Sequence, residues 1–201
     1  MKTLIVHYTP RKGSNTKALL DYFTRKLDSE ITFLNLAEHP APHLDTKTLN
    51  AYVDRNFGGT DVKGSEGLDH MDRLHNQLSE HNTVVLAFPM YNFSEPAPVK
   101  AWFDSIIQAG KSFTMTEQGP QGLFTDKSAL IITTSGSDLS KNSPWAGQEH
   151  SHSLAVAQFG FIGINADIVY AHSTNNHELY VDQERLAKEK MDSIAERWNT
   201  N

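Results

Sequence analysis

The sequence predicts a doubly wound α/β protein with a sheet of five parallel strands in the order 2-1-3-4-5 and helices on both faces. Short apolar runs rich in β-branched residues are typical of strands that are buried on both faces of a parallel sheet. These runs alternate with segments whose apolar residues recur at helical spacing. Loops rich in Gly, Ser, Thr or Asn follow several of the runs. This alternation favours a parallel sheet with crossover helices over an antiparallel architecture.

Five runs predict the strands, at residues 3–8, 30–36, 83–88, 128–134 and 164–171. Helical patterns are centred on residues 18–27, 68–78, 99–107, 150–161 and 183–198. Ser94 is the expected N-cap of the third of these helices, because serine is a preferred cap and Pro96 and Pro98 fit only in or before a first turn. Gly and Pro residues between 111 and 123 predict a surface excursion or hairpin.

One stretch does not fit the alternation. Residues 44–67 are polar and weakly patterned, and they predict at most a short helix. We expect an insertion over the edge of the sheet that forms a pocket wall or a subunit contact.

Composition limits the class of protein. The 201 residues fit one domain, and 38% hydrophobic and 21% charged residues describe an ordinary globular chain. The absence of cysteine excludes disulfides, thiolate metal sites and cysteine nucleophiles. A net charge of −6 without a clustered basic face argues against nucleic-acid binding. No apolar run is long enough for a membrane span or a signal peptide, so we expect no membrane partner and a cytoplasmic location.

Three loops at strand carboxyl ends hold the unusual residues. After the first strand, residues 9–16 are rich in Gly, Ser, Asn and Thr and open a helix, which indicates either an ordinary N-cap or a cradle for a phosphate. The loop matches neither the Walker pattern nor G-x-G-x-x-G. Large aromatic and amide side chains follow the third strand, and Ser135-Gly136-Ser137 follows the fourth. In the flavodoxin-like strand order these loops converge at the switch point, where ligands bind.

A phosphate on the first loop and a flat ring between the other two would suit a flavin nucleotide. The ring needs apolar surface on one face and polar groups along its pyrimidine edge. Tyr91 and Phe93 suit the faces, and Asn92 suits the edge.

The same residues carry a family resemblance. Met90-Tyr91-Asn92-Phe93, the stretches 100–104, 109–113 and 116–123, and Thr134-Ser135-Gly136 resemble the FMN-dependent NADH-azoreductases and NAD(P)H quinone reductases, a flavodoxin-like family. The match runs in order along most of the chain. The first loop is shorter than in those azoreductases, and residues 44–67 have no clear match.

The resemblance implies FMN as cofactor, NADH or NADPH as electron donor, and two-electron reduction of a quinone or azo compound. It implies a homodimer with each active site at the interface. The implied cofactor-binding residues are Thr9, Arg11, Ser14, Asn15, Thr16, Pro89, Met90, Tyr91, Asn92, Phe93, Thr134, Ser135, Gly136 and Ser137. Phe113 matches an aromatic residue on the substrate side. No catalytic side chain is assigned, although Tyr91 lies in the right loop to donate a proton.

Other interpretations are weaker or stay open. His150 and His152 beside Glu149 do not share a helix face, so no metal site is expected there. Ser135 is not in a G-x-S-x-G elbow, which argues against a serine hydrolase. A flavodoxin-type electron carrier or a flavin-binding regulatory subunit would use the same fold. Trp145 is either a packing residue or a cover over the flavin.

Overall fold

A parallel sheet forms the centre of the molecule. The computed structural model describes residues 1–58, 62, 64–140 and 142–200. The spatial order of the sheet is β2-β1-β3-β6-β7. All of its neighbouring strands pair in parallel. Its strands are β1 (Lys2–His7), β2 (Glu30–Asn35), β3 (Thr83–Pro89), β6 (Ser128–Thr134) and β7 (Asn165–Ala171).

The hairpin accounts for the difference from the predicted strand numbering. β4 (Phe113–Thr116) and β5 (Gly119–Gly122) pair only with each other, antiparallel, outside the central sheet. The excursion that the Gly and Pro residues predicted is therefore this hairpin. It contributes two strands in chain order between β3 and β6, so the last two strands of the sheet are the sixth and seventh of the chain.

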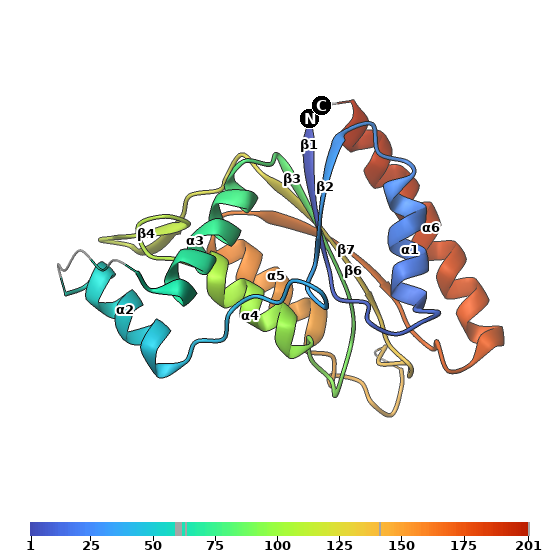
Figure 1. Cartoon of the computed structure of the whole chain (residues 1–201). Helices are drawn as coiled ribbons and strands as arrows, with labels where there is room; N and C mark the ends of the chain where they lie inside the picture. The colour runs from blue at the N-terminus through green and yellow to red at the C-terminus, as the bar shows by residue number, and fades with distance from the viewer. Residues whose placement is uncertain (59–61, 63, 141, 201) are drawn as a thin grey trace.

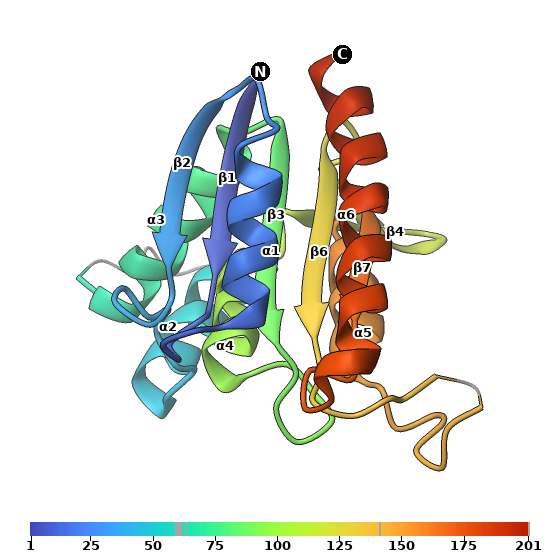
Figure 2. The same ribbon diagram turned by 90° about the vertical axis from the view of Figure 1, so that its right-hand side faces the viewer.

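Helices cover both faces of the sheet. α1 (Asn15–Thr24) and α6 (His177–Asn199) lie on one face, and the remaining helices lie on the other (Figures 1 and 2). The second group contains α2 (Thr46–Asn56), α3 (Glu66–Ser79), α4 (Ala97–Ile106) and α5 (Ser151–Phe161). The predicted pair of helical layers is present.

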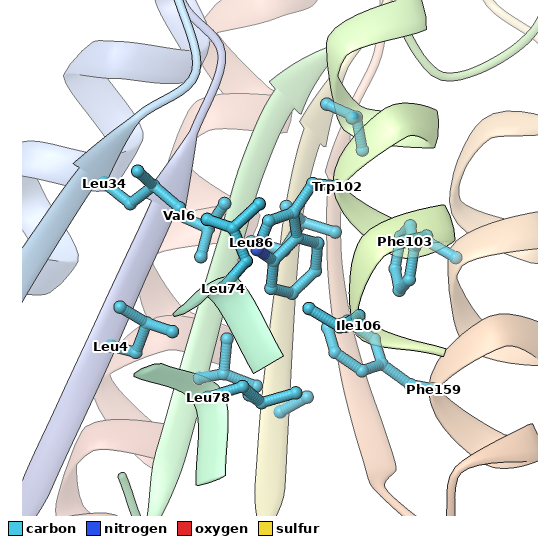
Figure 3. Packing of buried hydrophobic residues seen from close by; sticks show 14 of the residues in the cluster. Leu4, Val6, Leu34, Leu74, Leu78, Leu86, Trp102, Phe103, Ile106 and Phe159 are labelled. Carbon is cyan, nitrogen blue, oxygen red and sulfur yellow. The ribbon is translucent and has the colours of Figure 1, made fainter. Parts of the chain in front are cut away.

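Two hydrophobic cores follow from the pleat of the central strands. In β1, Ile5 packs against the α1 and α6 side, whereas Leu4 and Val6 pack against the other side. Figure 3 shows the second core, where Trp102 and Phe103 of α4 and Phe159 of α5 lie against the sheet. Trp102 and Phe103 are fully buried, as their helical spacing predicted.

Two predicted details are wrong. Ser94 is not the cap of α4, because the chain forms a tight turn first and Pro96 occupies the N-cap position without a side-chain hydrogen bond. The closing helix begins at His177 rather than near residue 183, capped by Asn176, whose side chain accepts the Leu179 N–H. In the 44–67 segment, the short helix that the sequence predicted is present as α2, and residues 59–61 and 63 of this segment lie outside the described residues.

α2 is fixed to its neighbours by polar contacts. Arg55 forms an ion pair with Asp72 of α3 at 2.8 Å and donates to the Gln108 side chain at 2.7 Å. The Tyr52 hydroxyl accepts the Ala109 N–H at 2.9 Å. These contacts attach the insertion beside α3 and the segment that leads into the hairpin.

Candidate cofactor-binding site

A pocket opens where the carboxyl ends of the parallel strands meet. Figure 2 shows β1, β3 and β6 running in one direction toward this end of the sheet. The pocket has a volume of about 190 Å³. It is lined by Thr9, Pro10, Arg11, Ser14, Asn15, Thr16, Pro89, Met90, Tyr91, Thr134, Ser135, Gly136, Thr174 and Asn175. Eleven of these fourteen residues were predicted from the sequence to bind the cofactor.

The first wall is the 9–16 loop and the start of α1. Ser14 is the N-cap of α1, and its Oγ accepts the Lys17 N–H at 3.2 Å. The first turn of α1 contains no acidic residue, so no side chain there neutralises the positive end of the helix dipole. The cap is therefore present, and the same loop also faces the pocket. With Arg11 in the lining, this wall is suited to an anion.

Buried hydroxyl groups tie the first wall to its neighbours. Thr16 is fully buried, and its Oγ1 lies 2.7 Å from Thr134 Oγ1 at the end of β6. His7 Nδ1 lies 3.0 Å from Thr9 Oγ1. Burial, followed by the charge of Lys17, lowers the pKa of His7 below its usual value, so its ring is neutral at neutral pH. These contacts fix the loop before any ligand binds.

The second wall follows β3 and contains a strained turn, which we call the 91–94 turn. Tyr91 and Ser94 exchange both backbone hydrogen bonds, at 3.0 and 3.1 Å. Asn92 and Phe93 between them have φ angles of 49° and 70°. Asparagine tolerates this left-handed region, but phenylalanine adopts it only when the surroundings enforce it.

The 91–94 turn is held from outside by the segment before α5. The carbonyl of Phe93 accepts the His150 N–H at 2.9 Å, and its ring packs against Trp145 at a centroid distance of 6.1 Å. Pro89, Met90 and Tyr91 line the pocket, whereas Asn92 and Phe93 are exposed beside it. Trp145 thus packs on Phe93 with an exposed ring, close to the mouth of the site.

The third wall combines the loops after β6 and β7. Ser135 Oγ donates to the Ser137 carbonyl at 2.7 Å, so the Tyr170 hydroxyl must be the donor in its 2.6 Å contact with Ser135 Oγ. A Cβ on Gly136 would lie 2.5 Å from Asn175 Nδ2, so a larger residue at this position would displace the Asn175 side chain. Ser137 supports Ser135 through its carbonyl and is not itself part of the lining.

Three lining residues were missed by the sequence analysis. Pro10 lies within the predicted loop but has no donor group, and Thr174 and Asn175 follow β7. Their backbone N–H groups donate to the Ser135 and Gly136 carbonyls at 3.0 and 3.2 Å. A run of polar residues after the last strand could have indicated them, because it ends at the same edge of the sheet as the other loops.

Phe113 lies elsewhere. It begins β4 of the hairpin, and its ring contacts Phe161 of α5 at a centroid distance of 4.8 Å. It does not line the pocket of its own chain.

Charged groups near the third wall form a local network. Burial opposes ionisation of Glu149, but hydrogen bonds from His152 and Ser151 outweigh it and lower the Glu149 pKa to about 2. Its Oε1 accepts the Ser151 and His152 N–H groups at 2.7 and 2.8 Å, so Glu149 acts as an acidic cap for α5. Within the described part of the chain, no three His, Asp or Glu side chains gather as a metal site.

A doubly wound sheet with a hydroxyl-lined pocket at its switch point defines a flavodoxin-like protein. The model of the family described as "Flavodoxin-like fold" matches residues 1–196. The FMN-dependent NADH:quinone oxidoreductase of Azotobacter vinelandii is 34% identical over 203 residues, covering 96% of this chain and 99% of the relative. The FMN-dependent NADH:quinone oxidoreductase 2 of Pseudomonas fluorescens is 36% identical, covering 72% of this chain and 69% of the relative.

A solved structure gives the same result. The FMN-dependent NADH-azoreductase of Bacillus anthracis in complex with FMN superposes with a TM-score of 0.87 at 25% identity, covering 99% of this chain and 100% of that chain. The chain therefore belongs to the flavodoxin-like family of FMN-dependent NADH:quinone oxidoreductases, as the resemblance implied. Among the described residues, no helix has the length and apolar character needed to cross a membrane.

Proposed function

We propose that this chain is an FMN-dependent oxidoreductase that transfers two electrons from NADH to quinones or azo compounds. The pocket at the α1 N-terminus carries the proposal, because it combines anion-binding groups with an aromatic and polar wall at the switch point. The names of the relatives support both the cofactor and the donor.

The chemistry of the lining fits FMN. The first wall offers the Ser14 and Thr16 hydroxyls, the Asn15 amide and the Arg11 guanidinium, which suit a phosphate and a polyol chain. The close approach of Gly136 and Asn175 leaves backbone and amide groups at the third wall, as the pyrimidine edge of a flavin requires. At about 190 Å³ the pocket is smaller than the 300–1,000 Å³ typical of ligand sites, so part of the cofactor would remain at the surface.

We assign the predicted residues to parts of this cofactor. Thr9, Arg11, Ser14, Asn15 and Thr16 would bind the phosphate end. The ring would lie between Pro89, Met90, Tyr91, Asn92 and Phe93 on one side and Thr134, Ser135, Gly136 and Ser137 on the other. Tyr91 is exposed at the mouth and is placed to donate a proton to a bound acceptor.

When bound, FMN supplies the redox chemistry by accepting a hydride from NADH and returning two electrons to the acceptor. The protein supplies position and electrostatics. Its hydrogen-bonded loops form the walls that would hold the cofactor, and the exposed 91–94 turn would leave room for a second flat molecule beside it. NADH is the donor named for the relatives, and the test below includes NADPH as well.

We further propose a homodimer of single-domain chains. Phe113 matches a substrate-side residue of the family but lies outside the pocket of its own chain, which supports a site shared between two copies. Met115 and Leu123 of the same hairpin segment are exposed, with 69% and 44% of their surface accessible. Light scattering would give the mass of a dimer, and Met115→Glu would weaken it. The cytoplasmic location stays a prediction.

The proposal is tested by the visible spectrum of the purified protein during titration with FMN, followed by anaerobic addition of NADH or NADPH. We expect a bound-flavin spectrum that bleaches with NADH and returns on addition of a quinone. Binding without bleaching would favour the electron carrier or regulatory subunit. Failure to bind FMN would exclude all of these functions.

A further inference from the structure

A buried carboxyl group lies directly behind the 91–94 turn. Glu95 follows this turn and precedes α4, and only 7% of its surface is exposed. Charged side chains are seldom buried to this degree unless they are paired. No cationic group is hydrogen-bonded to Glu95 among the described residues. Its only hydrogen-bond partner there is the neutral Gln158 of α5, whose Nε2 donates to Glu95 Oε1 at 3.3 Å.

Two oxygen atoms of this pair are left without partners. Glu95 Oε2 and Gln158 Oε1 are both buried, and neither has a hydrogen-bond partner within the described structure. A buried polar atom without a partner costs about 1–3 kcal/mol, so such atoms need an explanation. Both oxygens are acceptors when the carboxyl group is ionised.

One added proton would supply the missing partner. A carboxylic acid and a primary amide can form two parallel hydrogen bonds, with N–H donating to one carboxyl oxygen and O–H donating to the amide oxygen. The bond from Gln158 to Glu95 is already present. Protonation of Glu95 Oε2 would provide the second donor and satisfy Gln158 Oε1.

We propose that Glu95 and Gln158 form a proton-dependent latch that holds the 91–94 turn against α5 when Glu95 is protonated. Glu95 is a positioning residue in this account, because it does not line the pocket. Only the effect of the latch on FMN binding rests on the proposed function. The latch itself forms within the chain and can be tested without FMN.

The charges around Glu95 are compatible with a proton that exchanges near neutral pH. Burial raises the Glu95 pKa to about 7, opposed by the hydrogen bond from Gln158 and by the charge of Lys100, while Asp104 raises it further. Lys100 and Asp104 lie on α4 and form an ion pair with each other, which reduces their separate effects. The group that faces Glu95 from α5 is the uncharged Gln158.

The latch would act on the pocket through the strained turn. The left-handed Asn92 and Phe93 stay in place only while neighbouring contacts enforce them. The hydrogen bond from the His150 N–H to the Phe93 carbonyl and the packing of Phe93 on Trp145 act on the turn itself, and the latch acts on Glu95, the residue that follows it. Met90 and Tyr91 line the pocket immediately before the turn. Opening the latch should therefore loosen this wall and weaken FMN binding.

Glu95→Gln tests the latch because glutamine cannot ionise yet can form the same two hydrogen bonds with Gln158. Glu117→Gln on the hairpin is the matched control. Infrared spectra of the apo-protein should show a protonated-carboxyl C=O band that disappears near pH 7 in the wild type and the control and is absent in Glu95→Gln. A band that disappears near pH 4–5, or persists unchanged in Glu95→Gln, would overturn the latch.

The coupling to the cofactor is tested by the FMN dissociation constant between pH 6 and pH 8.5. The phosphate of FMN itself titrates near pH 6, so the informative quantity is the ratio of wild-type to Glu95→Gln values at each pH. We expect this ratio to rise at least about fivefold above pH 7, the lower end of typical coupling between sites. Gln158→Leu should weaken FMN binding at low pH, where the latch is closed in the wild type. In this variant, FMN affinity should no longer change with the protonation of Glu95.

The outcomes separate the two proposals. A constant ratio with a normal infrared titration would overturn the coupling of the latch to the pocket. If no variant binds FMN, the proposed function fails, and the infrared titration of the apo-protein still decides whether the latch exists.

Discussion

The first and second walls of the pocket, which are the 9–16 loop and the 91–94 turn, are built in different ways. The 9–16 loop is held by local contacts, because Ser14 caps the helix that follows it and His7 contacts Thr9 two residues away. The 91–94 turn is held by distant partners, since His150 and Trp145, which contact Phe93, lie more than fifty residues further along the chain. The first wall also has relaxed backbone at every residue except Gly13, whereas the second has two left-handed residues with large or polar side chains.

The difference suggests that the first wall binds the cofactor and that the second wall can change its position. A wall built from caps and hydroxyls is fixed whenever α1 is folded. A strained turn that depends on tertiary contacts can change its position when one of those contacts changes. We therefore expect the first wall to contribute affinity and the second to respond to conditions.

The largest expected effect concerns the second wall. The folded-state pKa of Glu95 is about 7, above its value of 4.5 in an unfolded chain, so the folded state holds the proton more tightly. The stability that this proton contributes is fully present below pH 4.5 and is lost as pH rises toward 7. A difference of about 2.5 pKa units corresponds to about 3 kcal/mol.

Glu95→Gln should remove this loss. Its free energy of unfolding should exceed that of the wild type by up to about 3 kcal/mol at pH 8 and match it at pH 4. Urea denaturation of the apo-protein at both pH values measures the difference, with Glu117→Gln as the control. Equal stability of Glu95→Gln and the wild type at pH 8 would show that ionised Glu95 does not destabilise the folded state. The contrast between the two walls would then be weaker.

The next effect concerns the first wall. Arg11→Gln should weaken FMN binding about 10- to 100-fold, because a hydrogen bond to a charged group contributes about 1.5–3 kcal/mol. Riboflavin, which has no phosphate, should bind both proteins with similar affinity. Lys12→Gln is the control, since Lys12 is exposed and does not line the pocket. An equal loss for riboflavin would place Arg11 away from the phosphate.

A smaller effect joins the first and third walls. Thr16→Val removes the buried contact with Thr134 Oγ1 and leaves that hydroxyl without its partner, at a cost of about 1–2 kcal/mol. Thr16→Ser keeps the hydroxyl and should recover most of the loss. Thermal unfolding of the apo-protein distinguishes the two. If valine and serine behave alike, the hydroxyl pair does not stabilise the wall.

The smallest effect is the cap of α1. Ser14→Ala should cost about 1 kcal/mol of stability, the usual value for loss of a side-chain cap. Ser14→Asp should retain the cap but repel a phosphate, so its stability should stay close to that of the wild type while its FMN affinity falls. A variant that keeps both properties would contradict the position of Ser14 beside the phosphate.

The same contrast explains what the sequence could predict. The central strands were located within one or two residues, because apolar runs such as residues 83–88 have few alternatives to a buried strand. The first wall was predicted as well, since Gly13, Ser14 and Asn15 are typical of a helix start. Local residues determine these features, so local patterns indicate them.

Features set by tertiary contacts were not predicted. Ser94 has the chemistry of a cap, but pairing with Tyr91 places it in a turn that ends before α4 begins. Glu95 is buried in the fold and contacts Gln158, and neither feature can be inferred from a glutamate between a serine and a proline. Thr174 and Asn175 reach the pocket through hydrogen bonds between the loops after β6 and β7, which lie far apart in the sequence.

The proposed function requires that flavin in this pocket carries electrons from NADH to an acceptor. Anaerobic stopped-flow spectroscopy of the FMN-loaded protein tests it most directly, by measuring bleaching with NADH and recovery with a quinone in separate mixings. We predict that both half-reactions are at least as fast as steady-state turnover. If either is slower than turnover, electrons do not pass through the flavin in this pocket, and the account is wrong.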